Sequence, residues 1–165
     1  MSLALIPPVR AASAATAAPA DLAVAAAANE ATWGEAMRRL CALRFADALE
    51  LFADDPCVRL VGAAPGAPSV VRGRPSLLAT WQGLGAAVRH AAYHQLAFHQ
   101  TVDPDVVFVE RRTDLTLRSG RVVSMSALDR VRFRDGRIAE LTEHLRPGEH
   151  ERVVRAVQDL ARMAG

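Results

Sequence analysis

The sequence predicts an α+β fold in which helices pack against one face of a curved β-sheet. Apolar residues at helical spacing characterise the first half of the chain. The second half contains three runs rich in Val, Leu, Ile, Phe and Thr, at 106–117, 121–133 and 137–145. Short turns containing Gly120 and Gly136 separate these runs, which is typical of an antiparallel β-meander.

Length and composition predict one domain with a sizeable core, because the chain has 165 residues of which 51% are hydrophobic. All 20 basic residues are Arg, and they are scattered among 18 acidic residues. This mixture lacks the basic patch of a nucleic-acid-binding protein. Cys41 and Cys57 lack the spacing of a zinc site, and we expect reduced thiols and no metal or cofactor.

The sequence offers little evidence of a membrane span or a signal peptide. No apolar run approaches the length of a membrane span, so we expect no membrane partner. The N-terminus lacks a basic region, and Pro7-Pro8 interrupts its short apolar run, which argues against a signal peptide. We therefore expect a cytoplasmic protein.

The N-terminal third divides into a tail and two helices. Residues 1–28 are mostly Ala and lack an apolar stripe, so we expect a disordered tail before a single domain over 29–165. Asn29 is a candidate N-cap for a first helix. One face of that helix would carry Trp33, Met37, Leu40 and Cys41, and a short second helix would run from Phe45 to Phe52.

The rest of the chain is predicted to add strands and two more helices. We expect short strands at 57–61 and 69–72, flanking a loop rich in Gly and Pro at 62–68. A helix should begin near Pro75, and strands should follow at 90–102 and through the meander. An amphipathic helix over 149–163 would either close the fold or dock on a second subunit.

Three local phrases, in this order, resemble the nuclear transport factor 2-like superfamily, which includes the SnoaL-like polyketide cyclases, ketosteroid isomerases and limonene-epoxide hydrolases. They are Leu51-Phe52-Ala53-Asp54-Asp55, Val71-Arg72-Gly73, and Asp135-Gly136-Arg137-Ile138. The resemblance implies a cone-shaped, mixed or antiparallel sheet (a cystatin-like α+β barrel) around an apolar pocket. Members of the superfamily are often dimers, so we also expect a homodimer. Pocket-lining positions are then expected at Trp33, Leu60, Trp81, Phe108 and Met125.

Residues 109–114 resemble the Glu-Arg-x-Asp phrase of limonene-epoxide hydrolases, with Arg112 and Asp114 on its Arg and Asp. Counted from Gly136, Glu143 falls where that family has its second Asp. The resemblance implies Glu143 as the base that activates water, Asp114 as the acid and Arg112 as the residue that orients them. This chain departs from the family because Glu replaces Asp and the loop 62–68 lacks the Tyr and Asn that hold the water.

Strand parity leaves an alternative for these residues. Arg112 and Asp114 share one face of the strand with Phe108, whereas the opposite face carries Val107, Val109, Leu115 and Leu117. Apolarity alone would bury the second set. Arg112 would then form an ordinary ion pair with Asp114, Glu143 or Glu110.

Asp129 is the fourth candidate catalytic residue. Residues 128–133 resemble the ketosteroid isomerase strand that carries an oxyanion-hole Asp, and Asp129 shares parity with Met125, Ala127 and Val131. We expect burial to raise its pKa so that the neutral carboxyl donates a hydrogen bond. The isomerase base would fall at Leu60 and its Tyr near Ala36, so a steroid isomerase site is incomplete; the alternative for Asp129 is a salt bridge to an Arg.

The leading hypothesis is a SnoaL-like small-molecule enzyme that uses cofactor-free general acid–base chemistry on an apolar, oxygenated substrate. Epoxide hydrolysis and polyketide-type cyclisation or isomerisation both fit this description. The alternative is a non-catalytic ligand-binding or dimerising module of the same fold. His90, His94 and His99 are expected to be structural or surface residues, because they do not converge as metal ligands.

Overall fold

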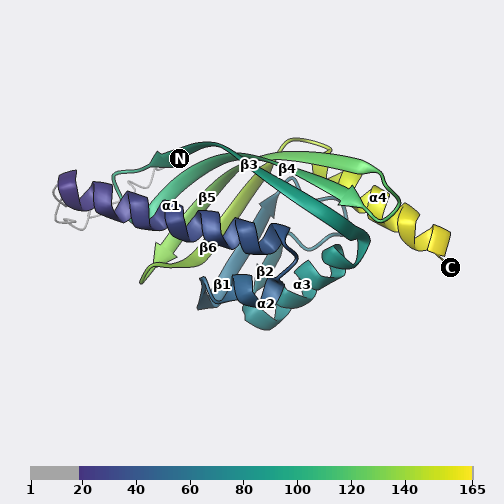
Figure 1. Ribbon diagram of the computed structural model, residues 1–165, viewed down its shortest axis with the longest axis horizontal. Coiled ribbons are helices and arrows are strands. Elements are labelled where there is room, and N and C mark those ends of the chain that lie inside the picture. The colour runs from purple at the N-terminus through teal and green to yellow at the C-terminus, as the bar shows by residue number, and fades with distance from the viewer. Residues whose placement is uncertain (1–18, 165) are drawn as a thin grey trace, which may run out of the picture.

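A long helix lies across the concave face of a curved, six-stranded sheet that does not close into a barrel (Figure 1). The computed structural model describes residues 19–164. Its helices are α1 (Pro19–Cys41), α2 (Phe45–Leu49), α3 (Arg74–Ala87) and α4 (Glu149–Ala164). Its strands are β1 (Phe52–Val61), β2 (Val70–Arg72), β3 (Val88–Gln100), β4 (Val106–Leu117), β5 (Val122–Arg134) and β6 (Arg137–Leu145).

The strands are ordered β2-β1-β6-β5-β4-β3, and all neighbours are antiparallel except β1 and β6, which are parallel. This arrangement confirms the predicted α+β fold and the meander. Asp135 and Gly136 both have positive φ, 53° and 70°, between the paired residues Arg134 and Arg137. Such a two-residue turn matches the right-handed twist of the strands that it joins.

The first helix begins ten residues earlier than predicted. Residues 19–28 belong to α1, so the expectation of a disordered tail is wrong for them, whereas 1–18 lie outside the described residues. Ala has the highest intrinsic helix propensity, and an Ala-rich run extends a packed helix without an apolar stripe of its own. Asn29 therefore lies inside the helix, where its Nδ2 donates to the Pro104 carbonyl at 2.8 Å instead of capping.

The first strand also begins earlier than predicted, at Phe52 rather than Cys57. Phe52 is fully buried and pairs with Ile138 of β6. The pairing register shifts between Phe52 and Cys57, and Pro56 lies within this irregular segment. A proline cannot donate to the sheet, so it is tolerated where the strand pairing is irregular.

The buried side chains form two clusters. One lies between α1 and the sheet and includes Trp33, Phe52, Phe133 and Ile138. The second joins β3, β4 and β5 to the inner side of α4, through Val88, Leu115, Leu117, Val123, Val153 and Ala156. The amphipathic α4 thus packs against its own chain, in agreement with the alternative that this helix closes the fold.

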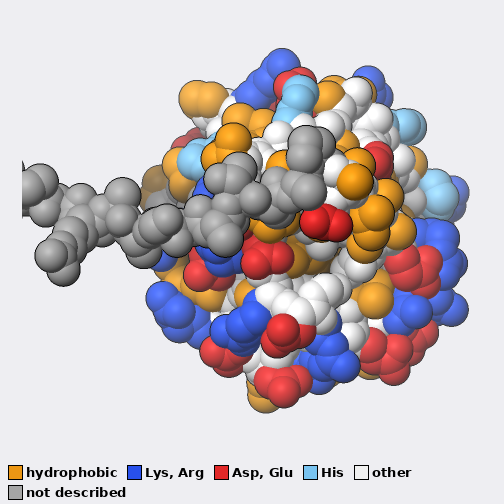
Figure 2. Space-filling model, turned by 90° about the vertical axis from the view of Figure 1, so that its left-hand side faces the viewer, with side chains coloured by type: hydrophobic (Ala, Val, Ile, Leu, Met, Phe, Trp, Pro, Cys, Tyr) orange, Lys and Arg blue, Asp and Glu red, His pale blue; other side chains and the backbone are white. Residues whose placement is uncertain are grey.

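The surface mixes charges of both signs. On the end of the molecule shown in Figure 2, acidic and basic side chains are interspersed rather than gathered in a patch of one sign. Arg137, for example, lies 3.8 Å from the carboxylate of Asp54. Within residues 19–164, no helix combines the length and apolar character needed to cross a membrane.

Gly85 of α3 should be intolerant of any side chain. A Cβ atom at this position would lie 2.5 Å from Cε2 and Cζ of Phe45, whereas one at Gly83 in the same helix would meet open space. We expect Gly85→Ala to lower the free energy of unfolding by about 1–3 kcal/mol through overpacking. Gly83→Ala should raise it by up to about 1 kcal/mol through helix propensity. Urea denaturation of both variants checks this, and equal midpoints would contradict the close approach of Phe45 to α3.

Candidate functional site

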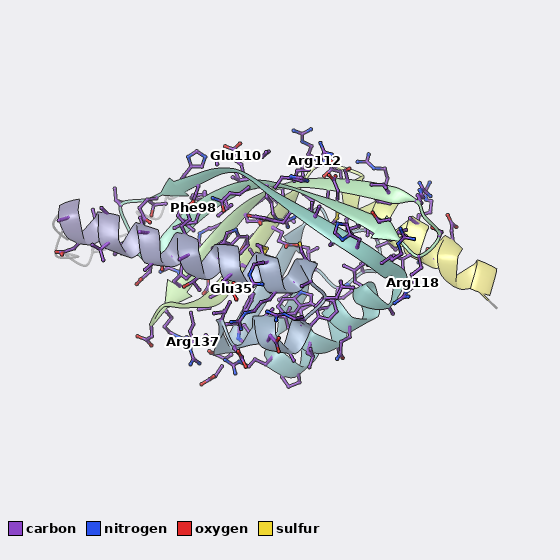
Figure 3. All side chains as sticks on the ribbon, viewed as in Figure 1. Glu35, Phe98, Glu110, Arg112, Arg118 and Arg137 are labelled. Atoms are coloured by element: carbon purple, nitrogen blue, oxygen red, sulfur yellow. The ribbon has the colours of Figure 1, made fainter. Side chains whose placement is uncertain are left out.

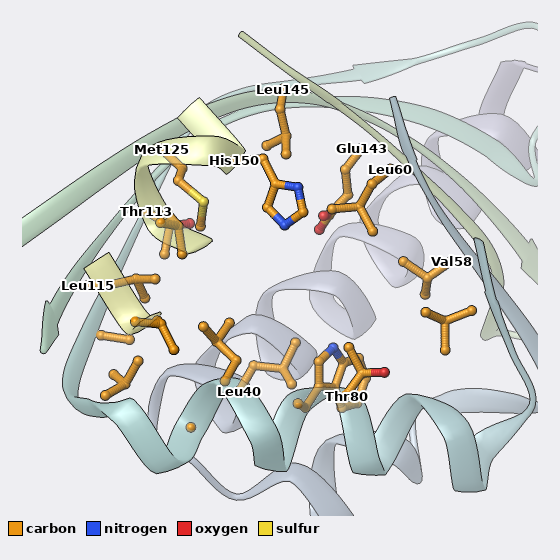
Figure 4. Close-up of a pocket in the computed structure, with 18 of the residues that line it drawn as sticks. Leu40, Val58, Leu60, Thr80, Thr113, Leu115, Met125, Glu143, Leu145 and His150 are labelled. Carbon is orange, nitrogen blue, oxygen red and sulfur yellow. The ribbon is translucent and has the colours of Figure 1, made fainter. Parts of the chain in front are cut away.

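A cavity of about 410 Å³ lies between the concave face of the sheet and the helices α1, α3 and α4 (Figure 4). Most of its lining is aliphatic or aromatic, with Ala67 and Pro68 contributed by the loop between β1 and β2. The polar exceptions are Cys41, Thr80, Tyr93, Arg111, Thr113, Glu143, His150 and Gln158. A largely apolar cavity with a few polar groups is the usual form of a small-molecule site.

Three of the five predicted pocket residues line this cavity, namely Leu60, Trp81 and Met125. Trp33 lies in the core instead, fully buried, with its Nε1–H donated to Tyr93 Oη at 2.7 Å. Phe108 pairs with His99 and Arg130 on the outer face of the sheet. Both expectations are wrong: an apolar residue can fill the core, or cover the outer face, as well as line a pocket.

Arg111 is the centre of the polar part of the site. Its Nε donates to Asp129 Oδ2 at 2.5 Å, its Nη2 to Glu143 Oε1 at 2.8 Å and its Nη1 to Thr113 Oγ1 at 3.0 Å. The side chain of Arg111 is only 6% exposed, and that of Asp129 is fully buried. Asp129 and Glu143 are direct cross-strand partners on β5 and β6, so the sheet register presents both carboxylates to one guanidinium.

The predicted trio of Arg112, Asp114 and Glu143 does not converge. Arg112 and Asp114 lie on the outer face of the sheet and do not line the cavity, and Figure 3 shows Arg112 pointing away from the helices. Arg112 donates from Nε and Nη2 to the two oxygens of Asp114, at 2.9 and 2.8 Å. Asp114 also accepts from Ser124 Oγ at 2.5 Å. The ion-pair alternative therefore describes these two residues.

The reason is the parity of β4. Val107, Val109, Leu115 and Leu117 are buried, and their burial directs the odd-numbered residues of this strand inward. Arg111 has the same parity, between Val109 and Leu115, so the sequence did contain the signal that identifies it. The motif resemblance selected Arg112, one residue away, and a shift of one residue exchanges the two faces of a strand.

Burial disfavours the charged forms of both Asp129 and Arg111, but neighbouring charges outweigh this effect only for Arg111. It raises the pKa of Asp129 to about 7, and the repulsion of Glu143 adds to this effect while Arg111 opposes it. Burial also disfavours the cation of Arg111, but the attraction of Asp129 and Glu143 outweighs it and raises the pKa of Arg111. The second oxygen of Asp129, Oδ1, is buried without a hydrogen-bond partner among the described residues. Asp129 thus has the raised pKa predicted for it, within a salt bridge to an Arg.

Tyr93 and Cys41 are two further titratable groups that line the cavity, and both have raised pKa values. Burial raises the pKa of Tyr93 to about 12, and Tyr93 lines the cavity beside Arg111. Burial likewise raises the pKa of Cys41, which remains a neutral thiol. On the outer face, in contrast, the hydrogen bond from Arg112 lowers the pKa of Asp114 to about 2.

His150 is a cavity residue that the sequence analysis did not identify. It lies at the start of α4, and its Nδ1 accepts the backbone N–H of Ala64 at 2.8 Å. The adjacent Glu149 accepts the backbone N–H of Ser126 at 2.6 Å. Within residues 19–164, no group of three or more His, Cys, Asp or Glu side chains is arranged to hold a metal ion.

Comparison with known proteins identifies the family. A family model described as the SnoaL-like domain matches residues 30–141. The chain belongs to the SnoaL-like family. No sequence among curated proteins matches it.

Solved structures share its fold at low sequence identity. A phenazine biosynthesis-related protein from Pseudomonas aeruginosa is 21% identical, with a TM-score of 0.66 over 82% of this chain and 90% of that chain. A protein from Burkholderia pseudomallei, described as nuclear transport factor 2-like, is 17% identical, with a TM-score of 0.65 over 79% and 97%. A Mycobacterium tuberculosis protein in complex with estradiol-17β-hemisuccinate is 18% identical, with a TM-score of 0.63 over 70% and 92%. These likenesses support the nuclear transport factor 2-like fold.

Replacing Arg111 should be far more damaging than replacing its neighbour. Arg111→Met leaves Asp129 and Glu143 without their shared cation, and removal of one partner of a buried ion pair costs about 3–5 kcal/mol. Arg112→Met, on the outer face, should leave the unfolding midpoint almost unchanged. Chemical denaturation at neutral pH compares the two, and similar losses would contradict the inward position of Arg111.

Asp129 should make the protein less stable as the pH rises. Its folded-state pKa is raised to about 7, above an ordinary value near 4, so between these values the folded state binds more protons than the unfolded state. The contribution of Asp129 is therefore complete below about pH 4 and is lost as the pH rises through about 7. Asp129→Asn should remove this part of the slope in urea denaturation between pH 4 and 8. Parallel pH profiles of the parent and the variant would show that burial does not raise the pKa.

Proposed function

We propose that the chain is a small-molecule enzyme that moves a proton on an apolar, oxygen-bearing substrate in the cavity, with Glu143 as the proton carrier. One observation carries this proposal. Glu143 lines the cavity with Oε1 held by Arg111, while Oε2 has no hydrogen-bond partner among the described residues. A carboxylate anchored through one oxygen presents the other to a ligand in a defined position.

The position of Glu143 next to Leu60 supports this role. Leu60 is where the resemblance to ketosteroid isomerases places the general base. In the parallel pairing of β1 and β6, Leu60 is the direct partner of Glu143, and both residues line the cavity. Leu60 cannot act as a base. Glu143, its partner on the neighbouring strand, offers a carboxylate close to the position of the isomerase base.

The proposed reaction begins with removal of a proton from the carbon next to a substrate carbonyl. Glu143 takes that proton, the C–H electron pair forms a carbon–carbon double bond, and the carbonyl π pair moves to the oxygen. In a substrate with a carbon–carbon double bond β,γ to the carbonyl, the enolate is a dienolate, and return of the proton from Glu143 to the γ carbon moves that double bond into conjugation with the re-formed carbonyl. Attack of the enolate carbon on a second carbonyl of the same molecule closes a ring, and the new alkoxide takes the proton from Glu143.

The charge balance of the site favours a neutral substrate. Arg111 faces Asp129 and Glu143 together, so it has no excess positive charge for an anionic ligand. The size of the cavity fits a compact, ring-containing molecule. Estradiol-17β-hemisuccinate, the ligand named for the Mycobacterium tuberculosis protein, supports an apolar ligand that carries oxygen atoms.

Epoxide hydration has less support than proton transfer. It uses one carboxylate on water and a second carboxyl group on the epoxide oxygen. Within residues 19–164, Glu143 is the one acidic residue that lines the cavity, since Asp114 lies on the outer face and Asp129 lies behind Arg111.

Proton exchange on a panel of apolar cyclic ketones tests the proposal. We expect the parent to exchange α-protons of tetralones or decalones for deuterium, as followed by ¹H NMR in D₂O. Glu143→Gln should lower this rate about 10²- to 10⁴-fold, because it removes the base but keeps a similar shape. Asp114→Asn, a change on the outer face, should leave the rate at the parent level.

Two results would contradict the proposal. Equal rates for the parent and Glu143→Gln would exclude Glu143 as the proton carrier. Ketones that raise the melting temperature of the parent without any exchange would favour the non-catalytic ligand-binding module.

A further inference from the structure

We propose that His150 is a second catalytic residue, whose Nε2–H donates a hydrogen bond to the substrate oxygen while Glu143 moves the proton. This inference rests on the proposed function, because it assigns a role in the same cavity. Three observations support it: the Ala64 N–H donates a hydrogen bond to Nδ1 of His150, the ring lines the cavity, and the Nε2–H group has no acceptor among the described residues.

The hydrogen bond from Ala64 determines which ring nitrogen of His150 carries the proton. Nδ1 accepts the backbone N–H of Ala64 at 2.8 Å, so Nδ1 cannot itself be protonated in this arrangement. The ring is therefore neutral, with its hydrogen on Nε2. Nε2–H has no acceptor among the described residues.

The ring is held firmly above the cavity. Glu149, the preceding residue, accepts the backbone N–H of Ser126 at 2.6 Å and ties the start of α4 to β5. Ala64 ties His150 itself to the loop between β1 and β2. One turn further along α4, Val153 is buried and Val154 lines the cavity. The imidazole is thus held through Nδ1, and the start of its helix is tied to the sheet, before any ligand binds, as preorganised catalysis requires.

His150 and Glu143 both line the cavity. Figure 4 shows the imidazole and the carboxylate next to each other, one from α4 and the other from β6, with Leu60 and Leu145 nearby. In the proposed arrangement, a substrate presents its acidic C–H to Glu143 and its carbonyl oxygen to the imidazole. A neutral imidazole can stabilise the negative charge that develops on such an oxygen.

A purely structural role does not account for both nitrogens. Joining α4 to the loop needs only an acceptor at Nδ1, and it leaves the Nε2–H donor facing an apolar cavity. His150 is half-buried, and a hydrocarbon ligand that displaces water from its Nε2–H would leave that donor without a partner, which disfavours binding. An oxygen atom on the ligand supplies that partner, so the same donor selects oxygenated ligands over hydrocarbons of equal shape.

Two probes of matched shape test this selection. 2-Naphthol places an oxygen where an enol would carry one, and 2-methylnaphthalene replaces that oxygen with a methyl group. We expect the parent to bind 2-naphthol more tightly. His150→Phe should weaken 2-naphthol about 3- to 10-fold, the equivalent of one hydrogen bond, and change 2-methylnaphthalene by less than about twofold. His150→Gln retains an N–H donor and should keep most of the preference.

The tautomer can be measured without a variant. In ¹⁵N-labelled parent protein, His150 should show a protonated Nε2 and an unprotonated Nδ1, and 2-naphthol should shift the Nε2 signal more than the Nδ1 signal. A protonated Nδ1, or an unchanged probe preference in His150→Phe, would overturn the role of His150. Neither result bears on Glu143, which the ketone exchange experiment tests separately. Failure of both probes to bind the parent would remove this inference and the apolar ligand site together.

Discussion

The buried guanidinium of Arg111 is the interaction on which the inner face of the sheet depends. Three strands contribute to it, since Arg111 comes from β4, Asp129 from β5 and Glu143 from β6. Two carboxylates of this kind could not face one another in an apolar interior without a cation between them. The cluster fixes the orientation of Glu143 and at the same time offsets part of the negative charge at the wall of the cavity. The same contacts therefore serve the stability of the sheet and the chemistry of the site.

The sequence was sufficient for the architecture because hydrophobic patterns and turn residues determine it locally. The meander and its Asp135-Gly136 turn were predicted correctly, and so was α4. The errors lie where tertiary packing overrides a local signal. An Ala-rich run continues α1, and Pro56 lies within a strand because the irregular pairing with β6 accommodates it.

The site was predicted only in part. Asp129 was predicted from the parity that it shares with apolar neighbours, and Glu143 from its position relative to Gly136 in a motif resemblance. Arg111 was missed because a motif resemblance was given more weight than the alternation of β4. His150 could not be found from its own helix, since its partner Ala64 lies in a distant loop. The residues that needed only strand parity were predictable, and the residue that needed a contact between distant segments was not.

The parallel pairing of β1 with β6 has a consequence for the order in which the molecule can form. β1 lies near the start of the domain, yet its central neighbour β6 is the last strand of the chain. During synthesis, β1 must wait for most of the domain to emerge before it gains that neighbour, and α4 follows later still. A fold that depends on such distant pairings is expected to form slowly. The wall that carries Leu60 and Glu143 is thus completed late, and any premature release of the chain leaves an open sheet edge exposed to other chains.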